Sequence, residues 1–297
     1  MKFLEERNRS DGADGPSSDL EVIDKIRNPD QLTNHLMNTD GRRKERKYKY
    51  LRISQIDGAC PREWVIGNLL NLKSVDIARF TNVWQMDMGS ALHWYVQNSE
   101  RYFGMTIVGY WKCLACGRRR RFGVRPKEKC EYCGALPEAT VYDEYMFRLT
   151  DPYRIVGKID LILRVAKVYR FGEIKTVSKD VDNPDGSHAA QLACYTYFSQ
   201  FDKDALPIKI DRSVSYICYF NKLFNYRSPV KTFPISVTEP MIKPFKQIAG
   251  AITNGIKTRV LPEALRICRP SFKATKAKGC AMRNYCKDFY DKGQVEI

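Results

Sequence analysis

The stretch GKIDLILRVAKVYRFGEIKT, residues 157–176, constrains the fold more than any other part of the sequence. Its aliphatic and β-branched residues predict two β-strands, Tyr153–Val165 and Val168–Val177, joined by a short polar turn. The rest of the chain is expected to be organised around this hairpin.

Three charged residues of the hairpin allow two interpretations. Asp160 lies on the first strand, whereas Glu173 and Lys175 lie two residues apart on the second and therefore share a face. Two carboxylates beside a lysine can hold a divalent cation and a polarised water, which is what the hydrolysis of a phosphodiester bond requires. An ordinary solvated sheet face carries the same kinds of charge, and the hairpin alone does not separate the two.

Composition narrows the class of partner. The chain has 297 residues, enough for a sizeable core and about two domains, and 50 basic residues against 34 acidic ones give a net charge of +16. Such an excess favours nucleic acid first and an anionic membrane second. No apolar run approaches the roughly 20 residues of a transmembrane helix, and the N-terminus lacks a signal peptide. We therefore expect no membrane partner and a cytoplasmic protein, in the host cytoplasm if a phage encodes it.

The order of helices and strands indicates an α/β core. Two helices are predicted in Ser54–Phe80 and Thr81–Phe103, with Pro61 suited to a first helical position. Strand patterns dominate from Glu138 to Ile235, interrupted by one helix at His188–Gln200, and this mixture is typical of an α/β fold. Five segments follow: a disordered basic tail (1–47), an N-terminal helical part (48–110), a zinc-ribbon insertion (111–137), the α/β core (138–235) and a C-terminal helix with a cysteine segment (236–297).

Two CxxCG motifs indicate a metal site. Their four thiolates form the tetrahedral set that structural zinc prefers, from Cys113, Cys116, Cys130 and Cys133. The segment between them is strongly basic and looks like a nucleic-acid clamp, with Arg118, Arg119, Arg120, Arg121 and Arg125 as candidate DNA contacts. A solvated hairpin tip is the alternative. Three further cysteines near the C-terminus, Cys268, Cys280 and Cys286, lack one ligand for a second four-thiolate site, which Cys60 can supply.

At this point four motifs, GSALH, GKIDLILR, GEIKT and QLACY, resemble in sequence and order the RecB-like branch of the PD-(D/E)XK nucleases. The resemblance covers roughly residues 50–290 and implies a restriction-endonuclease-like core, a mixed central sheet flanked by helices. It implies that Mg²⁺ or Mn²⁺ is held by His93, Asp160, Glu173 and the main-chain carbonyl of Ile174. It also implies that Lys175 assists hydrolysis, and that Gln191 and Tyr195 orient the active site and the DNA backbone.

The cysteines extend this resemblance. SQIDGACPREW and the C-terminal cysteines are similar to RecB-like nucleases that hold a 4Fe–4S cluster, among them AddB-type helicase–nuclease subunits and CRISPR-associated adaptation nucleases. The similarity implies a cluster on Cys60, Cys268, Cys280 and Cys286 that fastens the two ends of the nuclease together. The gap between Cys268 and Cys280 is longer than is usual in the family. Because four thiolates suit either metal, a second zinc remains an alternative, as do unligated thiols.

The expected function is that of a metal-dependent deoxyribonuclease, an exonuclease on single strands or duplex ends in DNA repair, recombination or phage replication. No GxxxxGK[ST] motif is present, so a helicase or recombination partner would be a separate chain. Two alternatives are a DNA-binding scaffold whose nuclease residues are vestigial, and a CRISPR-type adaptation partner that cuts DNA only within a complex.

Overall fold

The structure is a computed structural model that describes residues 40–99, 101–102, 105–202, 206–222, 230–268, 280–294 and 296–297. It separates into two units, residues 1–44 with 76–86, and residues 45–75 with 87–297. All the candidate site residues lie in the second unit. The predicted disordered tail lies outside the described residues up to residue 39, whereas Asp40–Lys47 is a strand, β1. No described helix is long and apolar enough to cross a membrane.

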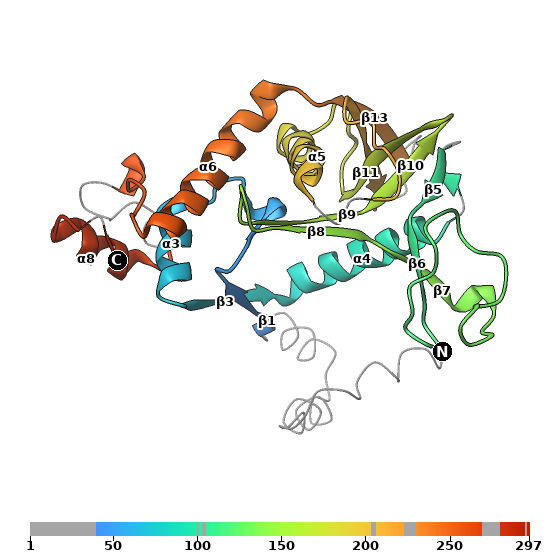
Figure 1. Cartoon of the computed structure of the whole chain (residues 1–297), viewed down its shortest axis with the longest axis horizontal. Helices are drawn as coiled ribbons and strands as arrows, with labels where there is room; N and C mark the ends of the chain where they lie inside the picture. Colours follow the sequence, from blue (N-terminus) through green and yellow to red (C-terminus); the bar gives the residue numbers. More distant parts are fainter. Residues whose placement is uncertain are drawn as a thin grey trace, which may run out of the picture. The chain divides into compact units, whose positions relative to one another are not determined.

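A mixed sheet of six strands forms the centre of the second unit (Figure 1). Strands β11 and β12 are parallel, whereas every other neighbouring pair is antiparallel. The mixed α/β class is thereby confirmed. In sheet order the strands are β13 (Val230–Ser236), β12 (Val214–Asn221), β11 (Val168–Val177), β10 (Leu161–Val165), β5 (Met105–Val108) and β4 (Arg101–Tyr102).

The predicted strand Tyr153–Val165 is two strands, and this is a correction. Ile155–Ile159 forms β9 in a three-stranded sheet with β2 (Leu51–Arg52) and β8 (Tyr145–Leu149), whereas β10 starts at Leu161 in the six-stranded sheet. Asp160 lies at the break. Its carboxylate accepts a hydrogen bond from the backbone N–H of Ile174 at 2.9 Å, and its carbonyl accepts one from Gln97 at 3.1 Å. These side-chain interactions replace ladder bonds where the chain changes sheets.

Helices cover the sheet and form a separate group near the C-terminus. They are α3 (Pro61–Leu69), α4 (Phe80–Gln97), α5 (Gly186–Phe198), α6 (Glu239–Thr258) and α8 (Arg283–Asp291), with short 3-10 turns at Ile53–Gln55, Pro137–Ala139, Ser199–Phe201 and Arg266–Cys268. Helix α3 packs against both α6 and α8, and Figure 1 shows α3 beside α6.

The first predicted helix begins where expected and ends early. Pro61 is its first residue. Proline lacks a backbone N–H, but the first N–H groups of a helix have no partner within the helix, so no hydrogen bond is lost there. Asn71 then adopts a left-handed conformation with φ of 49°. Residues Lys73–Arg79 form strand β3, which pairs with β1, so the helix expected across Ser54–Phe80 is wrong beyond Leu69.

The core packs on both faces of the six-stranded sheet. Along β10, Ile162 points into the cluster that contains α5, whereas Leu161 and Leu163 point into the cluster on the other face. This alternation is the two-residue period of a strand. Phe171 of β11 is fully buried on the α5 face, where replacement by Ala would cost about 3–5 kcal/mol. The sheet is therefore packed on both faces, which holds the side chains of the interior strand β11 in place.

A separate two-stranded sheet carries the CxxCG motifs. It pairs β6 (Tyr110–Cys113) with β7 (Thr140–Asp143), and we call residues 110–143 the cysteine ribbon. The ribbon thus extends beyond the predicted boundaries of 111–137 at both ends. In the chain, β5 comes directly before the ribbon and β8 directly after it, so the ribbon is inserted between two strands of the core.

Candidate functional site

Side chains from three elements meet beside the break at Asp160. His93 of α4, Glu144 between β7 and β8, and Asp160 each offer one ligand atom, and these atoms all lie within 4.8 Å of one another. The Nδ1 atom of His93 is 3.6 Å from Oδ2 of Asp160. We call these three residues, together with Glu173 and Lys175 of β11, the carboxylate centre.

A chain of hydrogen bonds connects β11 to helix α5. The Nζ atom of Lys175 lies 2.8 Å from Oε1 of Glu173 and donates to Oε1 of Gln191 at 2.9 Å. Gln191 in turn donates through Nε2 to the hydroxyl of Tyr195 at 3.1 Å. Because residues four apart share a helix face, Gln191 and Tyr195 can act on the same neighbour. These hydrogen bonds hold the Lys175 ammonium between the carboxylate of Glu173 and the side-chain amide of Gln191.

Burial makes the centre suited to a cation. It raises the pKa of Asp160 to about 7 and, together with the charge of Asp160, that of Glu173 to about 8. It also lowers the pKa of His93, which favours the neutral imidazole that binds metals. Among the described residues no hydrogen-bond partner reaches Oε2 of buried Glu173. Carboxylate oxygens with one imidazole are a ligand set for Mg²⁺ or Mn²⁺, so the residues fit such an ion.

Glu144 was not among the residues predicted from the sequence. It accepts a hydrogen bond from Gln97 at 2.5 Å and forms an ion pair with Lys158 of β9. The available signal was the acidic pair in TVYDEYMFRL, which interrupts an otherwise alternating strand pattern and marks the point where β7 ends and β8 begins. Metal binding by the carbonyl of Ile174 stays a prediction.

The four thiols of the cysteine ribbon lie close enough to bind one metal, such as zinc or an iron–sulfur group. Their sulfur atoms are within 4.8 Å of one another, with Cys113 and Cys133 3.7 Å apart. Gly117 and Gly134 follow the two motifs with φ of 71° and 72°, and each donates its N–H to the first cysteine carbonyl of its motif at 2.8 Å. Glycine is needed there because other residues avoid this conformation.

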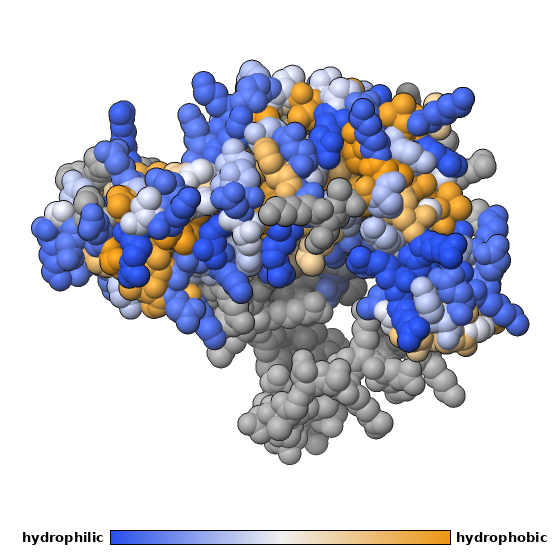
Figure 2. Space-filling model, in the orientation of Figure 1, coloured by the Kyte–Doolittle hydropathy of each residue, from blue (hydrophilic) through white to orange (hydrophobic). Residues whose placement is uncertain are grey.

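Most of the arginines of the cysteine ribbon make contacts within the protein. Arg120 is buried and donates to the carbonyls of Glu128 and Lys129, and Arg125 donates to the carbonyl of Asn98. Arg119 forms a 2.6 Å ion pair with Asp143 and lies over the ring of Tyr110, and Arg118 lies over the ring of Tyr132. Figure 2 shows hydrophilic side chains gathered over the ribbon, at the lower right of the view. DNA contact by these arginines stays a prediction.

The remaining predicted cysteine ligands line one small cavity. Cys60 precedes α3, Cys268 ends a 3-10 turn, Cys280 precedes α8 and Cys286 lies within α8; all four face a cavity of about 20 Å³. Burial raises the pKa of Cys60, Cys280 and Cys286, so these thiols keep their protons unless a cation is bound. We call these four residues the terminal cysteines.

Comparisons with known proteins leave the family open. No protein-family model matches the chain, and no curated protein matches it. A solved structure described as "Crystal structure of SSO0001" is similar over 90% of this chain and 95% of its own, at 14% identity and a TM-score of 0.36. A likeness this weak carries no argument about fold or function. The fold and the cysteine cluster define the class of protein: a mixed α/β protein with four cysteines placed so that they could bind a metal.

Proposed function

We propose that this chain is a metal-dependent nuclease of the RecB-like PD-(D/E)XK type that hydrolyses phosphodiester bonds in DNA. The observation that carries the proposal is the carboxylate centre. His93 and Asp160, expected to be ligands from motifs far apart in the sequence, offer ligand atoms within 4.8 Å of each other and of Glu144. Glu173 is not one of that closely spaced group, but it contacts Lys175 at 2.8 Å and lies near enough for its charge to shift the pKa of His93. The charge of +16 supports a polyanionic substrate.

Each side chain has a defined part in this chemistry. A divalent ion held by His93, Asp160 and Glu173 would neutralise phosphate charge and supply an activated water. The Ile174 N–H fixes the carboxylate of Asp160 at 2.9 Å, so this ligand is oriented before the substrate arrives. Lys175, held by Glu173 and Gln191, can orient the attacking water and stabilise the negative charge that develops on the phosphate.

The burial of Glu173 favours an enzyme over the alternative of a DNA-binding scaffold. A scaffold binds DNA through exposed cations and gains nothing from a carboxylate that is 4% exposed. Burying an ionisable group destabilises the folded state unless a cation or proton compensates it. Such a group is expected where a catalytic metal binds.

We further propose zinc in the cysteine ribbon and a 4Fe–4S cluster on the terminal cysteines. In the ribbon, hydrogen bonding from the Tyr132 backbone N–H lowers the pKa of Cys130, whereas burial and the neighbouring thiols raise the pKa of Cys133 despite a hydrogen bond from the Ala135 backbone. The cluster therefore favours one thiolate and needs a cation such as zinc to hold all four. At the terminal cysteines, all four thiols line one cavity, and no three of these described residues lie as close together as the thiols of the ribbon do. Metal analysis and visible absorbance separate the two: a colourless protein with two equivalents of zinc would contradict the cluster.

A variant at Lys175 tests the nuclease proposal. The wild-type protein should cleave labelled DNA when Mn²⁺ is added, and Lys175→Ala should lose about 100-fold or more in rate while its affinity for DNA changes little. Lys167→Ala is the matched control, because Lys167 is an exposed lysine in the turn of the same hairpin. Cleavage by Lys175→Ala at the wild-type rate would sink the assignment.

A further inference from the structure

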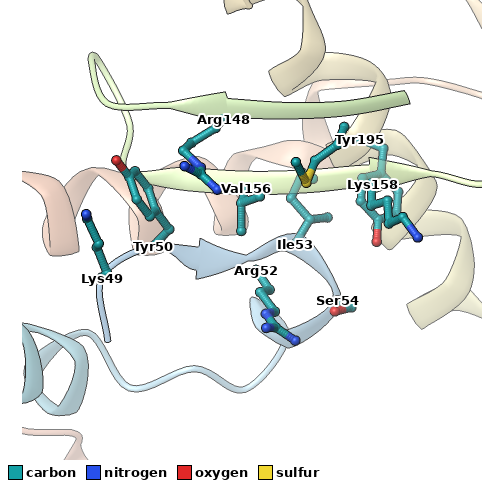
Figure 3. A pocket seen from close by; sticks show the side chains of 11 residues that line it. Lys49, Tyr50, Arg52, Ile53, Ser54, Arg148, Val156, Lys158 and Tyr195 are labelled. Atoms are coloured by element: carbon teal, nitrogen blue, oxygen red, sulfur yellow. The ribbon is translucent and has the colours of Figure 1, made fainter. Parts of the chain in front are cut away.

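A second cavity has a volume of about 560 Å³, and Figure 3 shows the side chains that line it. Its walls come from β2, β8 and β9, from the segment before β2, and from Tyr195 of α5. Its polar lining is Lys49, Tyr50, Arg52, Ser54, Arg148 and Lys158. We call this cavity the basic pocket. In Figure 3, Lys49 and Tyr50 lie at one end of it, and Lys158 and Tyr195 at the other.

The basic pocket carries positive charge that the described protein does not neutralise. Four of its lining residues are cations and none is a carboxylate. Within the part of the chain that the structure describes, Lys49, Arg52 and Arg148 form no ion pair. All three are exposed, so an anion can reach them.

An aromatic ring holds cations at the far end of the pocket in place. Arg148 lies 5.2 Å from the centre of the Tyr50 ring, and Lys49 lies 5.8 Å from it. Cation–π contacts of this kind limit the freedom of long side chains. The cations are therefore partly ordered before an anion arrives, which reduces the entropy lost on binding.

The near end of the pocket is connected to the carboxylate centre in two ways. Lys158 lines the pocket and forms an ion pair with Glu144 of the centre. Tyr195 lines the pocket as well, and its hydroxyl accepts the hydrogen bond from Gln191, which holds Lys175. A chain that occupies the pocket thus touches the same residues that position the centre.

We propose that the basic pocket binds the backbone phosphates of a single-stranded polynucleotide and leads that strand to the carboxylate centre. This inference rests on the proposed function and adds that the DNA substrate is single-stranded. The pocket is concave, so a flexible unpaired strand can follow its lining from Lys49 to Lys158, whereas a stiff duplex can contact its exposed cations only from outside. Cations without opposing carboxylates recognise the phosphates of the strand whatever its sequence.

Salt dependence of binding tests the proposal without relying on cleavage. A fluorescent single-stranded oligonucleotide is titrated without added divalent cation at several salt concentrations, and a denaturing gel confirms that it stays intact. Each phosphate contact contributes about 0.7 to the slope of log affinity against log salt for a single strand. Arg52→Ala/Arg148→Ala should therefore lower the slope by about 1.4, and Arg148→Lys should keep it near the wild-type value.

The control removes the same charge elsewhere. Lys167→Ala/Lys209→Ala alters two exposed lysines of a different cavity and should leave the slope unchanged. A blunt hairpin duplex should compete at least about tenfold more weakly than the single strand. Equal slopes for the two double variants, or equal competition by the duplex, would overturn the proposal. If only the nuclease proposal fails, cleavage is absent but the difference in slope remains; if only the pocket proposal fails, cleavage remains and the difference disappears.

Discussion

Replacing Glu173 by Gln is expected to change how stability depends on pH. Burial and the charge of Asp160 raise the pKa of Glu173 from its ordinary value of 4.5 to about 8. Between these values the folded protein holds a proton that the unfolded chain has lost. Without a bound metal, the free energy of unfolding of the wild-type protein is therefore highest below about pH 4.5. It falls as the pH rises from about 4.5 to about 8, and it stays constant above about pH 8 as far as Glu173 is concerned.

The size of the effect follows from the same shift. A rise from 4.5 to about 8 corresponds to on the order of 4 to 5 kcal/mol, since one pKa unit is about 1.4 kcal/mol. Glutamine does not ionise, and the attraction between the Glu173 carboxylate and Lys175 at 2.8 Å is already contained in the pKa of about 8. Because most of the interval between 4.5 and 8 lies between pH 5 and pH 8, we expect Glu173→Gln to gain about 3–4 kcal/mol of stability over wild type between these two pH values.

Unfolding by urea at pH 5 and pH 8, without added divalent cation, measures this difference. Glu131→Gln is the control, because Glu131 is exposed and should show wild-type behaviour. Added Mn²⁺ at pH 8 should stabilise the wild type and have little effect on Glu173→Gln, because the ion needs the carboxylate. If wild type and Glu173→Gln share one pH dependence, Glu173 does not ionise in a buried site and the reasoning is refuted.

Three further predictions concern the residues around the two kinds of metal site. Gln191→Ala should slow Mn²⁺-dependent cleavage by about 10- to 100-fold with little change in DNA affinity, because Lys175 loses its amide partner; steady-state kinetics would show an unchanged rate if Gln191 is dispensable. Cys116→Ser should remove about one equivalent of metal by elemental analysis. Cys60→Ser should abolish metal at the terminal cysteines, whereas Cys194→Ala, buried in the core, should keep it; equal metal content in both variants would contradict the site.

The sequence predicted best where local spacing decides the structure. The β10–β11 hairpin, the start of α3 at Pro61 and the paired CxxCG motifs all depend on neighbours within a few residues, and each is observed. Gln191 and Tyr195 share a helix face and are directly hydrogen bonded, as the spacing of four indicates. These features need no knowledge of the tertiary fold.

The sequence failed where long-range contacts decide. The pattern Tyr153–Val165 reads as one strand, and only the hydrogen bonds from Gln97 and Ile174 to Asp160 explain why it divides between two sheets. Glu144 was missed for a similar reason. It directly precedes β8, and the pairing of β8 with β9 is what brings it close to Asp160. The basic pocket combines residues about 100 apart in the chain, so spacing could not reveal it.

We propose that the carboxylate centre binds a divalent ion and hydrolyses DNA with it. The most direct test is the rate of cleavage of a labelled oligonucleotide by wild type and Asp160→Asn as Mn²⁺ is titrated. Asn keeps the shape of Asp160 but gives up the charge that holds the ion, so we predict saturable, Mn²⁺-dependent cleavage by wild type and a loss of about 100-fold or more in the variant. Equal cleavage by both proteins, or none by wild type at any Mn²⁺ concentration, would contradict the account.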